Sequence, residues 1–308
     1  MKNDAPVAFI AFNRPDLARR TFAAIRERKP SRLFLIADGP RPDSASDAQR
    51  CAEVRSILDA VDWPCEVHRD YADRNLGLKR RIVSGLDRVF ETVDRAIVLE
   101  DDCLPHPDFF KFCDELLARY EADERVWVIT GNNFQGGRRR GEASYYFSRH
   151  NHCWGWATWR RAWRHNDPDI RFWPQWRESE SWQQAIPDAV ERRYWEAIFD
   201  RAAAGELNSW AYPWTASVWR HGGLTATPNV NLVSNIGAGP EGTHTSAAST
   251  GVNLPAHALP SITHPAIVQA DARADRHAFD RHFRGWRLRF PVSWLRAIAR
   301  TLRLRTAS

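Results

Sequence analysis

Short apolar runs alternate with helical patterns along the first part of the chain. The apolar runs predict strands at residues 6–12, 32–37, 65–68, 96–99 and 126–130. The patterns between them predict helices at residues 15–28, 47–61, 77–93 and 109–120. Continuous apolar strands separated by helices are typical of a mostly parallel sheet with helices on both faces. The sequence therefore predicts a Rossmann-like α/β fold.

Polar residues follow three of the predicted strands, at the point where each strand ends. They are Asn13 and Arg14 after the first strand, Asp38 after the second, and Glu100, Asp101 and Asp102 after the fourth. In open α/β sheets, ligands bind beyond the carboxyl ends of the strands. We therefore expect these three clusters to form one site at one edge of the sheet.

The three consecutive acids are the strongest chemical signal in the chain. Carboxylates directly after a buried strand are costly unless positive charge lies beside them. Mg²⁺ and Mn²⁺ prefer carboxylate oxygens and take the rest of their ligands from water and substrate phosphates. Acid clusters are also common in solvated loops and at helix starts. The strand before the triplet favours a metal site here.

The second half of the chain is rich in tryptophan and has a different texture. A strand is predicted at residues 145–148, and helices at 159–165, 189–204 and 209–219. Residues 136–141 and 229–245 are glycine-rich and predict loops, and residues 246–270 show little periodicity and are expected to lie along the surface. The tryptophans fit a packed core, or an acceptor cleft in which indole faces stack on sugar rings.

The stretch at residues 89–120, which contains AIVLEDDCLPHPDFFKFCDELLARY, resembles the N-acetylglucosaminyltransferase I group and the protein O-mannose N-acetylglucosaminyltransferases. The chain also looks like bacterial sugar transferases of the same nucleotide-diphospho-sugar superfamily, over residues 6–245. The resemblance implies a GT-A fold, a UDP-sugar donor and a divalent metal. Residues 1–131 would be the nucleotide-sugar half and 132–245 the acceptor half of one domain. Residues 246–280 would be a surface segment and 281–308 a basic tail.

The resemblance assigns roles at the strand ends. Asp102 would bind the metal, Asp101 would lie near the ribose or the metal, and Glu100 would support both. Arg14, with Asn13, matches an arginine that contacts the base, and Asp38 matches an aspartate that binds uracil. A helix-capping network for Arg14 and a turn-forming role for Asp38 are the alternatives.

Further donor contacts are expected from the helix at residues 77–93. The family places a basic residue on this helix against the nucleotide, and Lys79, Arg80 and Arg81 are the candidates. Helix starts combined with Arg or Lys suit a diphosphate. The alternative is a set of exposed charges on the helix surface.

The acceptor side departs from the family pattern. Trp154 and Trp156 are expected near the sugar, and Trp210 matches the start of a helix that carries a catalytic aspartate in the family. Ala211 stands at the position of that aspartate. An inverting transferase needs a general base, and the substitutes are Glu206, Asp200 and Glu241. Alternatively, the enzyme is retaining or inactive.

A late histidine is a further candidate metal ligand. His244 lies in the glycine-rich segment 229–245, and imidazole suits Mn²⁺. A plain hydrogen-bonding role for His244 is the alternative. The same loop fits a lid that closes over the donor and excludes water.

The excess positive charge of the chain is concentrated near its C-terminus. The net charge is +6, but residues 281–305 contain eight arginines, and no acid follows Asp280. The remainder is near neutral, which argues against a nucleic-acid surface. Residues 290–305 fit a helix that lies on an anionic membrane surface, or one that packs on the protein itself. The five scattered cysteines, with no secretory signal, fit a cytoplasmic protein, peripheral at the inner face of the membrane if the tail binds there.

The leading hypothesis is a metal-dependent glycosyltransferase of bacterial envelope polysaccharide assembly. It would move a sugar, with N-acetylglucosamine one candidate, from a nucleoside diphosphate to a glycan or glycolipid. The alternatives are a degenerate nucleotide- or carbohydrate-binding protein and a sugar-phosphate nucleotidyltransferase. The nucleotidyltransferase is disfavoured because the loop at residues 11–19 is not glycine-rich. Neither a Walker loop nor a Gly-x-Gly-x-x-Gly fingerprint is present.

Overall fold

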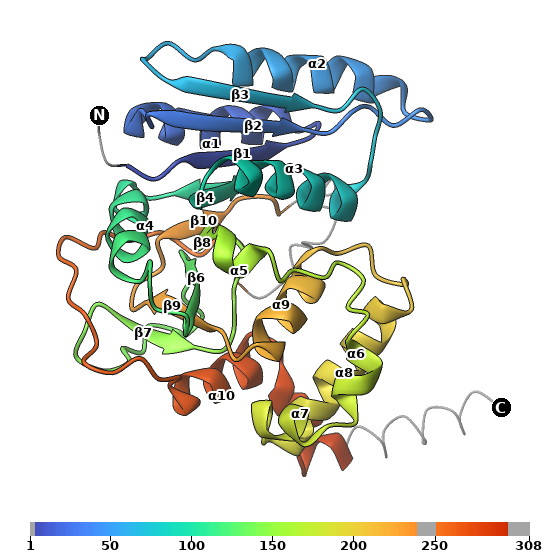
Figure 1. The fold of residues 1–308 in the computed structure, drawn as a ribbon, viewed down its shortest axis with the longest axis vertical. Coiled ribbons are helices and arrows are strands. Elements are labelled where there is room, and N and C mark those ends of the chain that lie inside the picture. The colour runs from blue at the N-terminus through green and yellow to red at the C-terminus, as the bar shows by residue number, and fades with distance from the viewer. Residues whose placement is uncertain (1–3, 239–250, 295–308) are drawn as a thin grey trace.

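The computed structural model describes residues 4–238 and 251–294, which fold around a central eight-stranded sheet (Figure 1). Its strand order is β3-β2-β1-β4-β8-β6-β9-β7. The strands are β1 (Val7–Ala11), β2 (Arg32–Ala37), β3 (Glu66–Tyr71), β4 (Arg95–Glu100), β6 (Val126–Thr130), β7 (Tyr145–Ser148), β8 (Trp156–Trp159) and β9 (Leu224–Pro228). A separate antiparallel pair joins β5 (Cys103–Pro105) to β10 (Val233–Asn235).

The sheet is mostly parallel, which confirms the predicted fold class. Strands β1, β2, β3 and β4 pair in parallel with one another. Strand β8 runs antiparallel between β4 and β6, and β7 runs antiparallel along β9. The order β3-β2-β1-β4 is that of one half of a doubly wound sheet, so the carboxyl ends of β1, β2 and β4 meet at one edge.

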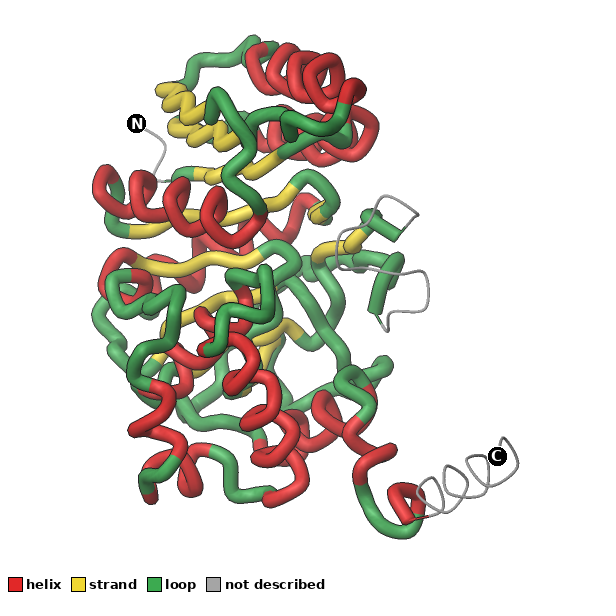
Figure 2. Tube along the Cα trace, turned by 90° about the vertical axis from the view of Figure 1, so that its right-hand side faces the viewer, coloured by secondary structure: helices red, strands yellow, loops and turns green. Residues whose placement is uncertain are grey.

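Helices cover both faces of the sheet, which Figure 2 shows along the stack of strands. They are α1 (Pro15–Arg28), α2 (Ala45–Asp59), α3 (Leu78–Thr92), α4 (Pro107–Arg119), α5 (Arg160–Trp163), α6 (Trp173–Arg177), α7 (Glu180–Ala185), α8 (Ala189–Ala203), α9 (Ala211–Arg220) and α10 (Ala272–Arg281). The core has two parts, one on each face. Val7 and Phe9 of β1 belong to one part, and Ala8 and Ile10 to the other, because successive strand residues point to opposite faces.

Tryptophans fill the second part of the core. Trp173, Trp176 and Trp182 form edge-to-face contacts with ring centroids 4.9 to 5.9 Å apart. Helices α5 to α9, which carry or flank these residues, make up the aromatic-rich helical half that the sequence predicts. The helix predicted at residues 159–165 is shorter in the structure, Arg160–Trp163, and it begins one residue late because Trp156–Trp159 forms strand β8. Periodicity missed this strand because every residue in it is buried.

The chain after residue 251 is partly as predicted. Residues 251–269 contain no helix or strand and run along the protein, where Leu259 N donates to Asp108 Oδ2 at 2.9 Å. Helix α10 was not predicted, and it buries Ala274, Ala278 and Phe279. A short 3₁₀ turn, Gly285–Leu288, follows. The helix predicted at 290–305 lies almost wholly outside the described residues, among which no helix is long and apolar enough to cross a membrane.

Candidate functional site

The acidic turn joins β4 to β5 and is held in place by its backbone. Thr21 of α1 donates its hydroxyl to the carbonyl of Asp101 at 2.8 Å, and Ile236 N donates to the carbonyl of Asp102 at 2.8 Å. Gly237 packs directly on Asp102, and a Cβ at that position would lie 2.4 Å from Asp102 Oδ2. The turn is therefore fixed from two sides, and one of these contacts needs glycine.

Arg14 supplies the positive charge beside the turn. Its guanidinium forms an ion pair with Asp101 and places Nη1 3.1 Å from Asp102 Oδ2. Burial alone would lower the pKa of Arg14, but the charges of Asp101 and Asp102 outweigh it and raise that pKa. Arg14 occupies the N-cap position of α1 without a side-chain cap bond, so the capping alternative is not what the structure shows.

The carboxylates outnumber the cations at this point. Loss of water around Glu100, together with the charges of Asp102 and Asp101, raises the pKa of Glu100 to about 8. Burial also raises the pKa of Asp101, and Arg14 offsets only part of the shift. Asp101 and Asp102 share one guanidinium, so the turn carries uncompensated negative charge even while Glu100 is protonated. A divalent cation with hard oxygen ligands fits this donor set.

The protein ligands for such a cation would be few. Among the described residues, no three His, Cys, Asp or Glu side chains are grouped to hold a metal ion by themselves. Asp102, with Asp101 beside it, would hold the cation, and phosphates and water would complete the shell. His244, the other predicted metal ligand, and Glu241, a predicted base, lie outside the described residues.

A cavity of about 620 Å³ opens in front of the turn. Its wall combines the ends of β1, β2 and β4 with the starts of α2 and α3. The lining residues include Asn13, Arg14, Asp38, Arg41, Asp47, Arg50, Asn75, Arg81, Glu100, Asp101 and Asn208. The three polar clusters that follow the strands in sequence therefore do meet, at one sheet edge and around one cavity.

Asp38 has a structural task in this wall. Its carboxylate accepts hydrogen bonds from the backbone N–H of Leu76 at 2.9 Å and of Gly77 at 3.1 Å, and from Asn75 Nδ2 at 3.1 Å. It thereby ties the end of β2 to the loop before α3. This geometry matches the turn-forming alternative, and a uracil contact by Asp38 stays a prediction.

Asp47 is a wall residue that sequence reasoning missed. It lies on α2, is 1% exposed, and accepts from Asn13 Nδ2 at 2.8 Å and from Arg41 Nε at 2.6 Å. The hydrogen bond from Arg41 is the largest cause of a lowered pKa of Asp47. Arg41 also lies over the Phe12 ring, 5.4 Å from its centroid. Sequence reasoning missed the pair because Arg41 lies in the Pro-rich loop before α2, which carries no strand or helix signal.

Of the three basic candidates on α3, only one lines the cavity. Arg81 is 4% exposed, pairs with Asp70 and lines the cavity. Lys79 forms an ion pair with Asp169 at 2.9 Å and is absent from the lining, as is the exposed Arg80. Arg81 is therefore the one of the three that we propose as a donor contact.

The predicted bases lie outside the cavity wall. Asp200 accepts from Trp173 Nε1 at 2.9 Å and has Arg177 3.7 Å away. Glu206 pairs with Arg201 at 3.3 Å on the surface. Neither residue lines the cavity, although Asn208 does. A base role for Asp200 or Glu206 remains a prediction.

The three tryptophans proposed for the acceptor have different surroundings. Trp156 is 1% exposed and Trp210 is 3% exposed, and their rings stack with centroids 5.4 Å apart. This burial gives both a packing role and leaves no ring face for a sugar. Trp154 is partly buried and meets Phe134 edge to face, with centroids 5.6 Å apart. We retain an acceptor role for Trp154 alone.

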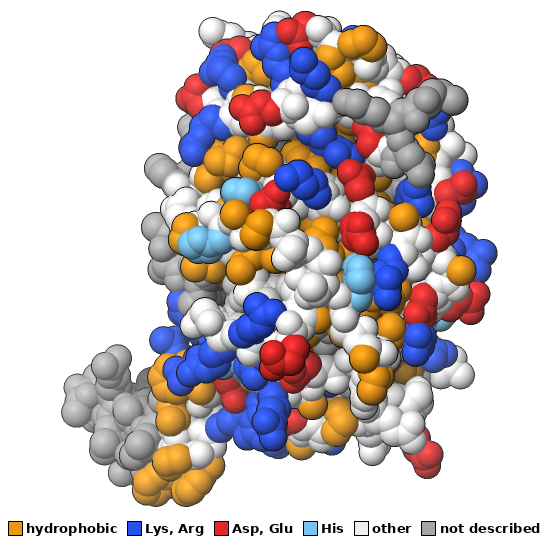
Figure 3. Space-filling model, turned by 90° about the vertical axis from the view of Figure 1, so that its left-hand side faces the viewer, with side chains coloured by type: hydrophobic (Ala, Val, Ile, Leu, Met, Phe, Trp, Pro, Cys, Tyr) orange, Lys and Arg blue, Asp and Glu red, His pale blue; other side chains and the backbone are white. Residues whose placement is uncertain are grey.

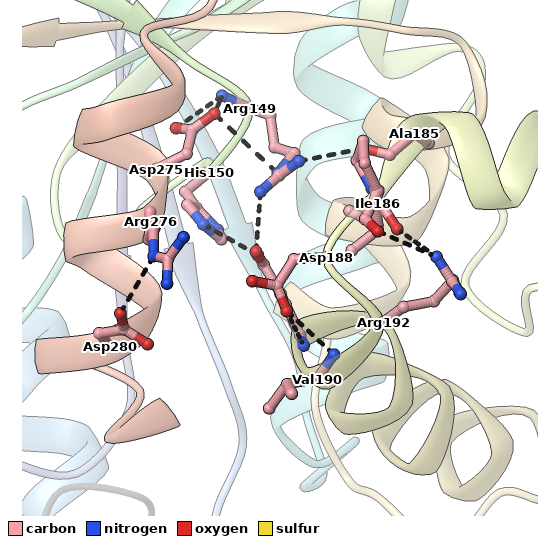
Figure 4. A network of polar contacts seen from close by, with 12 residues as sticks. Arg149, His150, Ala185, Ile186, Asp188, Val190, Arg192, Asp275, Arg276 and Asp280 are labelled. Atoms are coloured by element: carbon pink, nitrogen blue, oxygen red, sulfur yellow. Dashed lines mark hydrogen bonds and ion pairs between the residues drawn. The ribbon is translucent and has the colours of Figure 1, made fainter. Parts of the chain in front are cut away.

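A second polar cluster lies between α8 and α10 (Figure 4). Arg149 donates to Glu191 Oε2 at 2.9 Å and to the carbonyl of Ala185 at 3.1 Å, and its backbone N–H lies 3.3 Å from Asp275 Oδ1. His150 lies 3.4 Å from Glu191. These contacts join the end of β7 to α8 and α10. The cluster borders a cavity of about 430 Å³, and its arginine, Arg149, is already paired with Glu191.

No protein-family model and no curated protein sequence matches this chain. Solved structures with similar architecture exist. A mannosyltransferase from Pyrobaculum calidifontis, in complex with GDP-Man and Mn²⁺, is 15% identical with a TM-score of 0.40, over 70% of this chain and 73% of that one. HddC from Yersinia pseudotuberculosis is 9% identical with a TM-score of 0.31, over 51% and 78%. A 4-diphosphocytidyl-2C-methyl-D-erythritol synthase from Anaerococcus prevotii is 9% identical with a TM-score of 0.32, over 58% and 79%. At these values the likeness assigns no activity.

Proposed function

We propose that this protein is a metal-dependent glycosyltransferase that uses a nucleoside diphosphate sugar, with UDP as the first candidate nucleotide. The observation that carries the proposal is the acidic turn of Glu100, Asp101 and Asp102 at the carboxyl ends of three parallel strands. Glu100 and Asp101 line a cavity of about 620 Å³ there, and Asp102 follows them directly without being part of the lining. Arg14, Arg41 and Arg81 line the same wall. Excess carboxylate beside arginines suits a cation and a diphosphate together.

In this proposal the protein binds and orients the donor. A divalent cation on Asp102, when bound, neutralises the charge that develops on the departing diphosphate. Arg14 holds the two aspartates in position. Arg41 and Arg81 also line the wall, each paired with an acid, Asp47 and Asp70 respectively. An acceptor hydroxyl oxygen forms the new bond to the anomeric carbon, the bond from that carbon to the diphosphate breaks, and the hydroxyl proton goes to a base. Asp200, Glu206 and Glu241 remain the candidates for that base.

The finer parts of the proposal come from the resemblance. The likeness of residues 89–120 to N-acetylglucosaminyltransferase I favours N-acetylglucosamine as the sugar and a glycan or glycolipid as the acceptor. A role in envelope polysaccharide assembly follows from this acceptor class.

A membrane-facing position is supported by one surface. Large hydrophobic side chains are exposed to solvent within residues 286–294. They are Trp286, Leu288, Phe290 and Trp294, and each is 42% to 80% exposed. Figure 3 shows hydrophobic side chains gathered at the lower end of one face, with Lys and Arg close by. Aromatic residues beside arginines suit the interface of an anionic membrane. We propose that this cluster, here called the aromatic surface, lies on the inner face of the membrane.

A second candidate function is a protein that binds nucleotide or glycan without turnover. It is favoured by Ala211, and by the finding that neither Asp200 nor Glu206 lines the cavity. A nucleotidyltransferase is less well supported, since Phe12-Asn13-Arg14 follows β1 in place of a glycine-rich loop.

The first test is thermal stability with Mn²⁺ and a panel of nucleoside diphosphates. A nucleotide at about 100 times its Kd should stabilise the protein by about 2.7 kcal/mol, visible as a shift of several degrees. The shift should require Mn²⁺ and disappear in Asp102→Asn, while the exposed control Asp62→Asn retains it. Hydrolysis of the matching nucleotide sugar would then show that the protein is an enzyme. Binding without hydrolysis would favour the second candidate function. No shift with any nucleotide would reject the donor site.

A further inference from the structure

A separate cavity of about 530 Å³ lies on the same sheet edge as the acidic turn. Asn133 and Phe134, which follow β6, and Asn229 and Asn231, which follow β9, form one side of it. Because β4, β6 and β9 all run in the same direction, the carboxyl ends of all three strands lie at this edge. The cavity is therefore a neighbour of the donor cavity.

Strand β10 connects this cavity to the acidic turn. Asn231 lines the cavity, and Asn235, four residues later, pairs with Cys103 next to Asp102. Four residues of extended chain span at most about 14 Å. This distance suits an acceptor sugar that reaches from the cavity to a donor sugar at Asp102.

The cavity has an aromatic wall. The rings of Phe134 and His282 stack with centroids 3.8 Å apart, and both line the cavity. Trp154, the tryptophan that keeps a proposed acceptor role, packs edge to face on His282 with centroids 6.3 Å apart. Ring faces beside polar asparagines are a common setting for sugars.

The rim of the cavity carries positive charge that no carboxylate among the described residues pairs with. Within residues 4–238 and 251–294, Arg138, Arg140 and Arg281 form no ion pair with any carboxylate, and Arg281 lines the cavity. Arg138 and His277 both lie close to Gly136, another lining residue. Burial and the charges of Arg138, Arg140 and Arg281 lower the pKa of His277.

The acid that acts on His277 does not cancel this charge. Asp280 acts on His277 in the opposite direction, but its carboxylate already pairs with Arg289 at 2.7 Å and lies 3.7 Å from Arg276. Arg140 Nε donates to the neutral Gln135 Oε1 at 2.8 Å. The rim therefore attracts anions more than neutral ligands.

We propose that this cavity binds the acceptor, and that Arg138, Arg140 and Arg281 select an acceptor sugar that carries an anionic group, a carboxylate or a phosphate. The acceptor role rests on the proposed glycosyltransferase function. The preference for an anionic sugar rests on the cavity and its arginines alone.

The test compares three sugars of the same ring by calorimetric or NMR titration of the full chain. Glucose is neutral, glucuronate adds a carboxylate and glucose 6-phosphate adds a phosphate. At low salt, at least one anionic sugar should bind at least about fivefold more tightly than glucose. The preference should shrink as salt rises. The anionic sugar whose affinity exceeds that of glucose by the larger factor identifies the acceptor class, carboxylate or phosphate.

Variants test whether the anionic sugar binds in this cavity. The double substitution Arg138→Gln with Arg281→Gln should reduce the binding of the anionic sugar to the level of glucose. Arg273→Gln is the matched control, because Arg273 is also an exposed arginine on α10 but does not line the cavity. All of these side chains lie at the surface, so the variants should fold, which circular dichroism checks. Equal binding of all three sugars, no detectable binding of any, or loss in Arg273→Gln would overturn the proposal.

A competition experiment separates this site from the donor site. Saturating Mn²⁺ and nucleoside diphosphate should not displace the anionic sugar, and Asp101→Asn should not weaken it. Displacement would place the sugar in the donor cavity and overturn the proposal. If no nucleotide binds while the anionic preference and its loss in the double variant hold, the glycosyltransferase function fails and the anion site stands.

Discussion

Arg14 Nη1 lies 3.1 Å from Asp102 Oδ2, and the same guanidinium pairs with Asp101. One side chain at the start of α1 thus restrains two acids that follow β4. Since those acids are largely buried and close together, the arrangement of the proposed cation site depends on a residue 88 positions away in sequence.

Replacing Arg14 by Gln should destabilise the protein and the acidic turn. The substitution leaves buried carboxylates without their countercharge, so the free energy of unfolding should fall by about 2–3 kcal/mol in urea titrations without metal. Mn²⁺ should recover part of the loss, since a cation replaces the missing charge. Arg26→Gln breaks an exposed pair with Asp62 and serves as the control with little change expected. Equal stability of the two variants would show that the Arg14 pair is not needed.

Gly237→Ala should disturb the metal site from the opposite side. The added Cβ would lie 2.4 Å from Asp102 Oδ2 and 2.9 Å from Asp102 Cβ, so Asp102 must move. We expect the Mn²⁺-dependent thermal shift with nucleotide to be lost. In an Asp102→Gly background the contact disappears, and the same substitution should then change stability much less. Additive effects of the two substitutions would contradict the contact.

Substitution should distinguish the packing role of Trp156 from the proposed acceptor role of Trp154. Trp156→Ala removes a fully buried ring from the core and should lower the free energy of unfolding by about 3–5 kcal/mol in urea titrations. Trp154→Ala removes a partly exposed ring and should cost about 1–2 kcal/mol. In the titrations with anionic sugars, Trp154→Ala should weaken binding. A larger stability loss in Trp154→Ala than in Trp156→Ala would reverse the assigned roles.

Stability should depend on pH through His152. Burial, with smaller contributions from the charges of His282 and His150, lowers the pKa of His152 well below its ordinary value of 6.5. Below pH 6.5 the unfolded chain takes up a proton that the folded protein refuses, so stability is lost as the pH falls. Between pH 7.5 and 5.5, wild type should lose about 1.4 kcal/mol more than His152→Gln. Urea titrations at both pH values measure this difference, and parallel losses would remove His152 as the cause.

The aromatic surface should bind anionic membranes. Wild type should sediment with vesicles that contain phosphatidylglycerol and much less with neutral phosphatidylcholine vesicles. The double substitution Trp286→Ser with Phe290→Ser should reduce binding several-fold, since each exposed ring adds apolar area to the contact. Ile267→Ser is the matched control, because Ile267 is 68% exposed outside this surface. Binding that is unchanged in the double variant would place the contact elsewhere.

Much of the donor half could be predicted from the chain alone. The helix at Pro15–Arg28 and the strands at Arg32–Ala37 and Val126–Thr130 match the predicted bounds, because their apolar periods are strong and their ends carry proline or polar residues. Strand β8 was missed, since a fully buried strand next to a helix has no distinguishing period. The anchoring of Asp38 to Leu76 and Gly77 was open as well, because sequence does not show which donors a carboxylate meets. The proposed acceptor cavity could not be predicted either, because its asparagines follow β6 and β9, two strands far apart in sequence.

The position of β8 has a consequence for the newly made chain. Strand β4 pairs with β8 along one edge, and Trp159, the last residue of β8, is made 59 residues after Glu100. At about 5–20 residues per second, ribosomal synthesis leaves that edge of β4 without its partner for about 3–12 s. All the residues of the acidic turn exist by then, beside an open and apolar strand edge of the kind that pairs with other chains. During synthesis, then, the half that forms the proposed donor site exposes a strand edge that a chaperone could shield until β8 is made.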